Sequence, residues 1–300
     1  MEGGDEASHS ADGCGPKLHM VHVKNSYVPR YGSQGERAII QDVVAAHELV
    51  GCMEKNEFTR WDGAVGSAQE HCEWMLCQGR SLLSKEREGE WRNKGAKKGI
   101  NYLIHDGITS KVGQGDPCFL LKANLEIPPK AIVGLMQHCP LLLEIDPSTL
   151  IIKHLKMYPG EKAGDPYTLC SYWQNSPGFP FVTRDGIDVS SFRQDEDSTW
   201  WHVSLSPPHH CPAVKGGVRA VDTYWVYKLV PLDGERTDCS LICQTRINGD
   251  RAAGRGWIPQ FFMHRLMGRV LADYIRTVER IGKRELRNGN LQQIFDNVGL

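Results

Sequence analysis

The last helix-forming stretch of the chain, residues 258–284, is the feature that most constrains the fold. Its apolar side chains recur at i, i+4 spacing in two adjacent columns, so one broad face of the helix is apolar. A helix of this kind must bury that face against another layer of structure. The columns are Phe262, Leu266, Val270, Tyr274 and Val278, and Met263, Met267, Leu271 and Ile275; Arg265, Arg269, Arg276 and Arg280 lie away from them.

A run of strand candidates precedes this helix and would supply that layer. Turn signals such as Pro159-Gly160 and Asp233-Gly234 separate short apolar and aromatic segments. The connections have hairpin length, which favours an α+β fold with an antiparallel sheet over alternating βαβ units. We expect strands at about 100–104, 118–127, 149–158, 166–174, 181–192, 200–206, 217–230 and 238–248.

Three further helices are expected from apolar periodicity and punctuation. They span about residues 36–56, 67–86 and 128–138; Ser67 is an N-cap candidate, and Pro140 ends the third helix. We divide the chain into a loosely attached arm (1–35), a helical extension (36–66), a main domain (67–284) and a C-terminal tail (285–300).

Composition and charge exclude several classes of protein. Lys+Arg 35 against Asp+Glu 36 gives a net charge of −1, which argues against a nucleic-acid partner. There is no run of about 18 apolar residues and no secretory signal at the N-terminus. The ten cysteines form no Cys-x-x-Cys pair, and we interpret them as reduced thiols of a cytoplasmic protein.

Motifs for catalysis or cofactor binding are absent from the sequence. It has no phosphate-binding loop, dinucleotide fingerprint, nucleophile elbow or His-Glu-x-x-His helix. His209-His210-Cys211 and the pair His19 and His22 are the candidate metal ligands, but no second ligand pair stands at a matching spacing. We therefore expect no metal and no cofactor.

A set of short motifs, in order, carries a resemblance to a known family. The motifs are Ile145-Asp146-Pro147, Tyr172-Trp173, Phe179 to Asp185, Val203 to Ser206, Lys215 to Ala220 and Gly254 to Pro259. With these motifs the chain resembles the steroidogenic-acute-regulatory-related lipid transfer (START) domain over about residues 67–284, and within that family the phosphatidylcholine-transfer and ceramide-transfer branches.

The resemblance implies a helix-grip fold, in which a curved antiparallel sheet wraps around the C-terminal helix and leaves an internal lipid tunnel. It implies non-enzymatic binding and intermembrane transfer of a phospholipid, sphingolipid or sterol by a cytoplasmic protein that contacts membranes peripherally. Two alternatives stay open. One is a lipid-gated regulatory module whose residues 1–66 bind a partner. The other is a helix-grip cyclase or hydrolase that would use Asp188, His202 and Tyr172.

The same resemblance implies which residues line the tunnel. Trp173 matches an inward aromatic residue that helps to enclose a choline group by cation–π attraction. Because side chains alternate along strands, Leu169 and Ser171 share its face, as do Gly186, Asp188, Ser190 and Phe192 on the next strand. From the C-terminal helix we expect Phe262, Leu266, Met267 and Val270 to line the tunnel.

Departures from the family pattern concern the lipid head group. Gly186 stands at the position of the choline-cage tyrosine, and Leu142 at that of the phosphate-pairing arginine. The acid–base pair of the sterol-binding branch falls at Ser171 and Ser190. We therefore expect weak selection for a phosphate head group, and the sequence does not name the lipid.

We expect one group of charged residues to be structural and a second group to contact membranes. Arg184, Asp185 and Arg219 are expected to fix the start of a strand and the adjoining loop. Arg265, Arg269 and Arg276 are expected to contact an anionic membrane surface. The C-terminal helix would then act as the gate of the tunnel, with Gly254-Arg255-Gly256 as its hinge.

Overall fold

The computed structural model describes residues 52–60, 63–87, 89–105, 118–160, 166–176, 183–207, 218–219, 223–244, 260–298 and 300. The arm, most of the predicted helix 36–56, the candidate ligands His19, His22 and His209 to Cys211, and the proposed hinge lie outside these residues.

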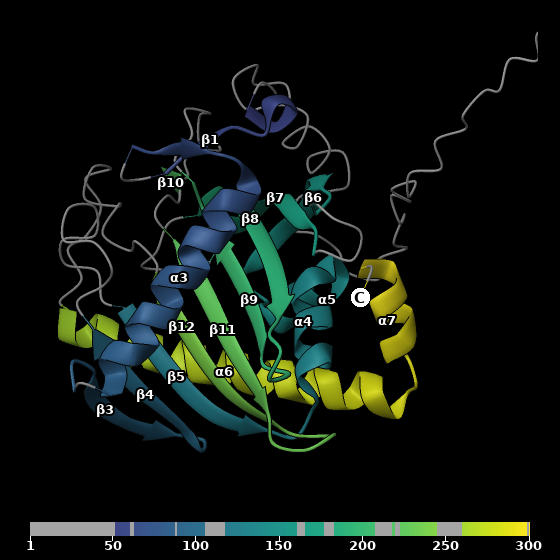
Figure 1. The fold of residues 1–300 in the computed structure, drawn as a ribbon. Helices are drawn as coiled ribbons and strands as arrows, with labels where there is room; N and C mark the ends of the chain where they lie inside the picture. The colour runs from purple at the N-terminus through teal and green to yellow at the C-terminus, as the bar shows by residue number, and fades with distance from the viewer. Residues whose placement is uncertain are drawn as a thin grey trace, which may run out of the picture.

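One large antiparallel sheet forms the centre of the molecule (Figure 1). Its strand order is β3 (Arg92–Lys97), β4 (Ile100–His105), β5 (Cys118–Leu125), β12 (Thr237–Gln244), β11 (Tyr224–Pro231), β9 (Trp200–Leu205), β8 (Arg184–Gln194), β7 (Thr168–Asn175) and β6 (Thr149–Tyr158). The short β10 (Val218–Arg219) pairs in parallel with β8, and β1 (Phe58–Thr59) pairs with β2 (Val65–Gly66) apart from the sheet. The α+β prediction is confirmed.

The two long helices lie on opposite faces of this sheet (Figure 1). Helix α3 (Ala68–Arg87) covers the face that we call outer, where Met75 packs in one core with Val203 and Val226. Helix α6 (Gln260–Arg287) crosses the inner face, where Leu271 and Ile275 belong to a second core. Because side chains alternate along each strand, β5, β12 and β11 contribute apolar residues to both cores.

Three short helices pack beside α6. Helices α4 (Pro129–Gln137) and α5 (Cys139–Ile145) each begin with a proline in the first turn, where the missing N–H costs no hydrogen bond. After α5, the Asp146 carboxylate accepts hydrogen bonds from the Ser148 amide at 3.0 Å and from Asn175 Nδ2 at 3.1 Å, which fixes the turn into β6. The third helix, α7 (Leu291–Val298), packs on α4.

Several predicted elements agree closely with the structure. The strand expected at 149–158 is β6, and the helix expected at 67–86 is α3. Ser67 caps α3 as predicted: Ser67 Oγ accepts from the Glu70 amide at 3.1 Å, and Glu70 Oε2 accepts from the Ser67 amide at 2.7 Å.

Three predictions about the ends of the domain need correction. Strand β3 was not expected, because its residues are polar and mostly exposed and show no apolar alternation. Helix α6 extends to Arg287, and residues expected as a tail form α7, whose Leu291 and Ile294 are buried against α4. Val270, predicted to point inward, has 50% of its surface exposed. It lies at the margin of the apolar face rather than within it.

We predict that Gly79→Ala in α3 destabilises the protein. Alanine would favour the helix by about 1 kcal/mol. A Cβ at Gly79, however, would lie 2.7 Å from Val226 Cγ1 in the buried outer core, and overpacking typically costs about 1–3 kcal/mol. Urea unfolding should therefore show a net loss of about 1 kcal/mol.

The double variant Gly79→Ala/Val226→Ala is the control for this prediction. Removing the γ-methyl groups of Val226 makes room for the new Cβ, so the two changes together should cost less than the sum of the single changes. Strictly additive losses, or a stabilised Gly79→Ala variant, would show that α3 does not depend on this close approach.

Candidate functional site

The half-buried carboxylate of Asp188 accepts the hydrogen bonds that link the polar side chains of the inner face. Asp188 lies on β8 beside Trp173 of β7 and two serines at the end of β9. Trp173 Nε1 donates to Asp188 Oδ1 at 2.8 Å, and Ser204 Oγ donates to Oδ2 at 3.0 Å. Ser206 Oγ also donates to Oδ1. Three strands therefore meet at one side chain.

The electrostatic setting of Asp188 has two opposing parts. Burial raises the pKa of this carboxyl, because the charged form loses its hydration. The hydrogen bonds from Ser206, Trp173 and Ser204 lower the pKa and so oppose that shift. Among the residues that the structure describes, no Lys, Arg or His forms an ion pair with Asp188. The carboxylate can still receive a further donor or a cationic group.

Gly186 explains how Trp173 reaches this position. The two residues are opposite each other in the β7–β8 pairing, and a Cβ at Gly186 would lie 2.8 Å from carbons of the indole ring. The indole therefore fills the space that a side chain at 186 would need. Its N–H is held by Asp188, so Trp173 acts here as a hydrogen-bond donor as well as an aromatic surface.

Several side chains around this cluster on the inner face are not fully buried. Trp173, Asp188 and Ser204 keep partial exposure, although they lie on the face that α6 crosses. The aromatic residues Phe192, Trp200, Trp225 and Tyr274 are likewise only partly buried against the inner core.

The other predicted tunnel residues lie on or near the same face. Leu169 and Ser190 are buried on β7 and β8, and Leu142 of α5 packs against the inner core. On α6, Leu266 and Met267 are partly buried, and Met267 joins that core. The side chain of Phe262 is outside the described part of the structure.

Ser171 belongs to a second polar chain on the inner face, through His154 of β6. His154 Nε2 is 2.9 Å from the Gln137 carbonyl oxygen, which can only accept, so this nitrogen carries the proton. Nδ1 then accepts from Ser171 Oγ at 2.8 Å. The thiol of Cys139 lies 3.2 Å from the same Nε2, and burial raises its pKa to about 12. A protonated nitrogen cannot take the thiol proton, so this arrangement does not activate Cys139 as a nucleophile.

The residues considered for an enzyme do not converge. Tyr172 belongs to the outer core, and its hydroxyl donates to Asp185 Oδ2 at 3.4 Å. His202 is 5% exposed with its ring 5.8 Å from that of Tyr227, and within the described part of the chain neither of its ring nitrogens has a hydrogen-bond partner. Asp188, His202 and Tyr172 thus have separate surroundings.

The charged motif residues fall into two groups. Arg184 and Asp185 are buried where β10 pairs with the start of β8, and the backbone of Arg219 lies opposite Asp185. On α6, Arg265 and Arg269 are exposed. Arg276 instead donates to the Lys98 carbonyl oxygen at 2.7 Å and pairs with Glu279 at 2.5 Å, so it holds α6 on the β3–β4 turn.

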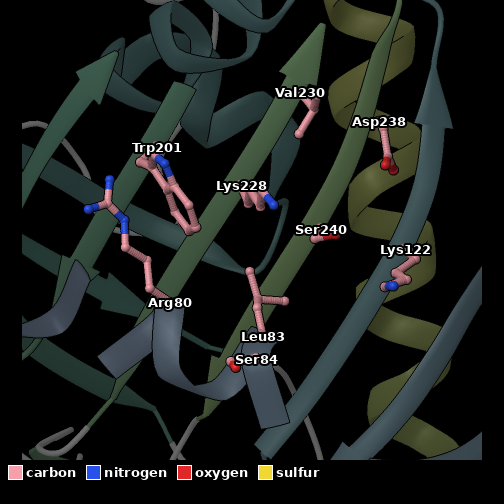
Figure 2. Close-up of a pocket in the computed structure, with 9 residues that line it drawn as sticks. All are labelled: Arg80, Leu83, Ser84, Lys122, Trp201, Lys228, Val230, Asp238 and Ser240. Carbon is pink, nitrogen blue, oxygen red and sulfur yellow. The ribbon is translucent and has the colours of Figure 1, made fainter. Parts of the chain in front are cut away.

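A pocket of about 440 Å³ lies on the opposite, outer face (Figure 2). It is bounded by the C-terminal half of α3 and by strands β5, β9, β11 and β12, and α6 is on the far side of these strands. Three cationic side chains line it, and sequence reasoning did not find it. Its lining residues are Arg80, Leu83, Ser84, Lys122, Trp201, Lys228, Val230, Asp238 and Ser240.

We also searched the described residues for a metal site, a membrane-spanning helix and disulfide bonds. These residues contain no group of three or more His, Cys, Asp or Glu that could hold a metal ion. None of their helices is long and apolar enough to cross a membrane. Their cysteines all carry free thiols.

Comparison with known proteins shows which fold this is. No protein-family model and no curated protein matches the sequence. Among solved structures, human STARD10 has a TM-score of 0.56 and 12% identity, covering 71% of this chain and 81% of that chain. The fold is the START-type helix-grip fold.

Two further START structures agree with this result. Human StAR-related lipid transfer protein 5 has a TM-score of 0.55 at 14% identity and covers 72% of this chain and 97% of its own. A STAR-related lipid transfer protein fragment from Xanthomonas axonopodis has a TM-score of 0.51 at 16% identity, covering 65% and 99%. At these identities the likeness establishes the fold alone.

Sequence reasoning missed part of the Asp188 cluster. Asp188 and Trp173 were placed on one face by strand alternation, but their hydrogen bond was not expected. Ser204 and Ser206 were noted only as part of a family motif. Their spacing of two along a strand puts both hydroxyls on one face, and this was the signal that could have linked them to Asp188.

We predict that His202 makes stability depend on pH. Burial lowers its pKa to about 4, against about 6.5 in the unfolded chain. The stabilisation is therefore complete above about pH 6.5 and is lost as pH falls towards 4, because the unfolded state then binds the extra proton. The shift corresponds to about 3 kcal/mol.

The variant His202→Phe tests this assignment. Its ring can still pack on Tyr227, but it cannot take up a proton. Urea unfolding at a series of pH values from 7 to 4 should show a loss of stability that is about 3 kcal/mol smaller in the variant than in the wild type. Equal losses in the two proteins would mean that other groups, such as His138 and His154, account for the acid sensitivity.

Proposed function

We propose that this protein binds one lipid between the inner face of the sheet and α6, and carries it between membranes without making or breaking a bond. The partly exposed polar cluster around Asp188, set in an otherwise largely apolar inner face, is the observation that carries the proposal. An apolar surface with one polar end matches a molecule with hydrocarbon chains and a small head group.

The energetics of lipid release explain why such a carrier is useful. Each buried CH₂ is worth about 0.8 kcal/mol, so a sixteen-carbon chain resists leaving a bilayer by roughly 13 kcal/mol. A protein interior as apolar as the bilayer makes the exchange nearly neutral and shortens the exposed step. No catalytic group is needed, and the protonated Nε2 of His154 beside Cys139 fits a non-catalytic role.

Asp188 suggests the class of lipid. A carboxylate that forms no ion pair with the described residues favours a ligand that donates hydrogen bonds or carries a positive charge. Leu142, at the position of the family's phosphate-pairing arginine, offers no charge to a phosphate. We therefore propose a lipid whose head group bears a hydroxyl or an amine rather than one recognised through its phosphate.

The full chain, purified from cells and examined by native mass spectrometry, tests the proposal directly. A bound mass that corresponds to a lipid, together with transfer of that lipid between vesicles, is the expected result. Protein that is always free of lipid, and that moves none between vesicles, would overturn the proposal.

We predict that Asp188→Asn changes which lipids the protein takes up. The amide keeps the shape of the carboxyl group but loses its charge, and charged hydrogen bonds exceed neutral ones by about 1 kcal/mol or more. Extraction of hydroxyl- or amine-bearing lipids from mixed vesicles should fall about ten-fold, as measured by mass spectrometry of the bound fraction.

Ser191→Ala is the matched control for that experiment. Ser191 is buried on the same strand, but side-chain alternation puts it on the opposite face from Asp188, and its hydroxyl donates to the Tyr167 carbonyl oxygen. The control should extract the same lipids as the wild type. If the Asp188→Asn variant is folded and extracts the same lipids as the wild type, Asp188 does not determine which head group is bound.

We also propose that the N-terminal half of α6 is the gate and the membrane contact. Among the side chains of α6 that the structure describes, which begin at Arg265, the polar contacts to other described elements all involve Asp273 or later residues, such as Arg276 to Lys98 and Arg284 to Glu144. Before them, Arg265, Arg269 and the exposed Val270 offer cations and an apolar side chain to a lipid surface. This half can leave the sheet while the rest stays anchored.

We predict that Arg265→Gln/Arg269→Gln slows lipid transfer to anionic vesicles. Each cation near such a surface contributes about 1 kcal/mol, so losing both should slow transfer up to about thirty-fold at low salt, and less at high salt. Lys55→Gln/Lys94→Gln removes the same charge from exposed positions outside α6 and should have little effect. Equal slowing on neutral vesicles would contradict charge-driven contact.

A further inference from the structure

A row of polar side chains crosses three neighbouring strands on the inner face. His154 of β6 is opposite Ser171 of β7, and Ser171 is opposite Asp188 of β8. Residues that are opposite each other on one face have Cβ atoms about 4.5–5.5 Å apart, so the Ser171 hydroxyl and the Asp188 carboxylate are neighbours. The direction of each hydrogen bond in this row determines what the row offers to a ligand.

The proton of the Ser171 hydroxyl is already engaged. The Gln137 carbonyl oxygen, 2.9 Å from His154 Nε2, keeps the ring proton on that nitrogen, so Nδ1 is an acceptor. Ser171 Oγ lies 2.8 Å from Nδ1 and therefore donates to it. What Ser171 has left for a ligand is the lone pairs of its oxygen.

The donors around Asp188 are engaged in the same way. Trp173 Nε1 and Ser206 Oγ both donate to Oδ1, whereas Ser204 Oγ donates to Oδ2. A carboxylate has about four lone-pair sites, two on each oxygen, so one site remains on Oδ2. Because Ser204 gives its proton to Asp188, its oxygen too has only lone pairs left for a ligand.

The described part of this cluster therefore offers acceptors: Asp188 Oδ2, Ser171 Oγ and Ser204 Oγ. Among the described residues of β8 and β9, the next donors on this face are the Ser190 hydroxyl and the His202 ring, each two residues or roughly 7 Å further along its strand. A lipid hydroxyl has one proton, and its own lone pairs would meet no donor in the cluster. A primary ammonium group has three N–H donors, no lone pair and a charge opposite to that of the carboxylate.

We propose that this cluster binds the primary ammonium group of a lipid, which donates to Asp188 Oδ2, Ser171 Oγ and Ser204 Oγ. His154 is a positioning residue, because it acts on the ligand through Ser171, whose hydroxyl it makes an acceptor. A quaternary ammonium group has the charge but no N–H, so it would not fit. The inference rests on the lipid site proposed above and narrows its head group from a hydroxyl or an amine to an amine.

Three probes with the same hydrocarbon chain separate charge from hydrogen bonding. Hexadecylamine, hexadecanol and hexadecyltrimethylammonium are each added at low content to phosphatidylcholine vesicles, and the full chain is analysed by native mass spectrometry after incubation. We expect the amine to be extracted about ten-fold more than either of the others, because it alone combines the charge with N–H donors.

The outcomes distinguish this inference from the proposed function. Equal extraction of the amine and the alcohol, or a preference for the quaternary probe, would overturn the ammonium site and leave lipid carriage intact. Extraction of none of the three probes would overturn both.

Variants of the row test the direction of the Ser171 hydrogen bond. Ser171→Ala removes one acceptor and should lower the ratio of amine to alcohol extracted about three-fold or more. His154→Phe leaves the Ser171 hydroxyl free to donate and should lower the same ratio. His154→Asn, whose side-chain oxygen can accept from Ser171, should keep most of it.

The ratio is the readout because a damaged protein loses both probes together. Ser191→Ala, on the opposite face of β8, is the control and should keep the ratio of the wild type. A ratio that neither Ser171→Ala nor His154→Phe changes would overturn the roles given to Ser171 and His154.

Discussion

The packing of α6 against the inner face of the sheet is the contact on which the rest of the structure depends. It buries Leu271, Ile275 and Val278 and covers strands that would otherwise expose a second apolar face. Close approach is possible because Gly268 and Gly282 lack side chains: a Cβ at these positions would lie within 3 Å of Tyr102 and Ile127. The sheet can then carry apolar residues on both faces, with α3 closing the outer one.

This packing is uneven along the helix, and the unevenness links the fold to the proposed function. The C-terminal half of α6 combines a buried apolar face with polar anchors on β3–β4, β5 and α5. The N-terminal half meets partly exposed inner-face residues and carries exposed Arg265, Arg269 and Val270. A carrier needs one part that keeps the fold and one part that opens, and a helix anchored at one end provides both.

Much of the fold could be predicted because it depends on local patterns. Capping of α3 by Ser67 and the bounds of β6 follow from a few neighbouring residues, and strand alternation placed Trp173 and Asp188 on one face. Prediction failed where a segment shows no apolar periodicity, and where the burial of a side chain depends on an element that is distant in the sequence. The polar edge strand β3 has no alternation of apolar and polar residues. Val270 lies at the edge of the apolar face of α6, and how much of that face is buried depends on the sheet on which it packs.

The sequence by itself determined the α+β class, the order of the central strands and long helices, and most of their apolar faces, because these follow from spacings along a single segment. Only the tertiary structure decided which polar groups meet. The Asp188 cluster joins β7, β8 and β9, and the outer pocket joins α3 to four strands, so both depend on strand register. Gly186 shows the difference: the sequence records a missing side chain, whereas the fold shows that the indole of Trp173 occupies its space.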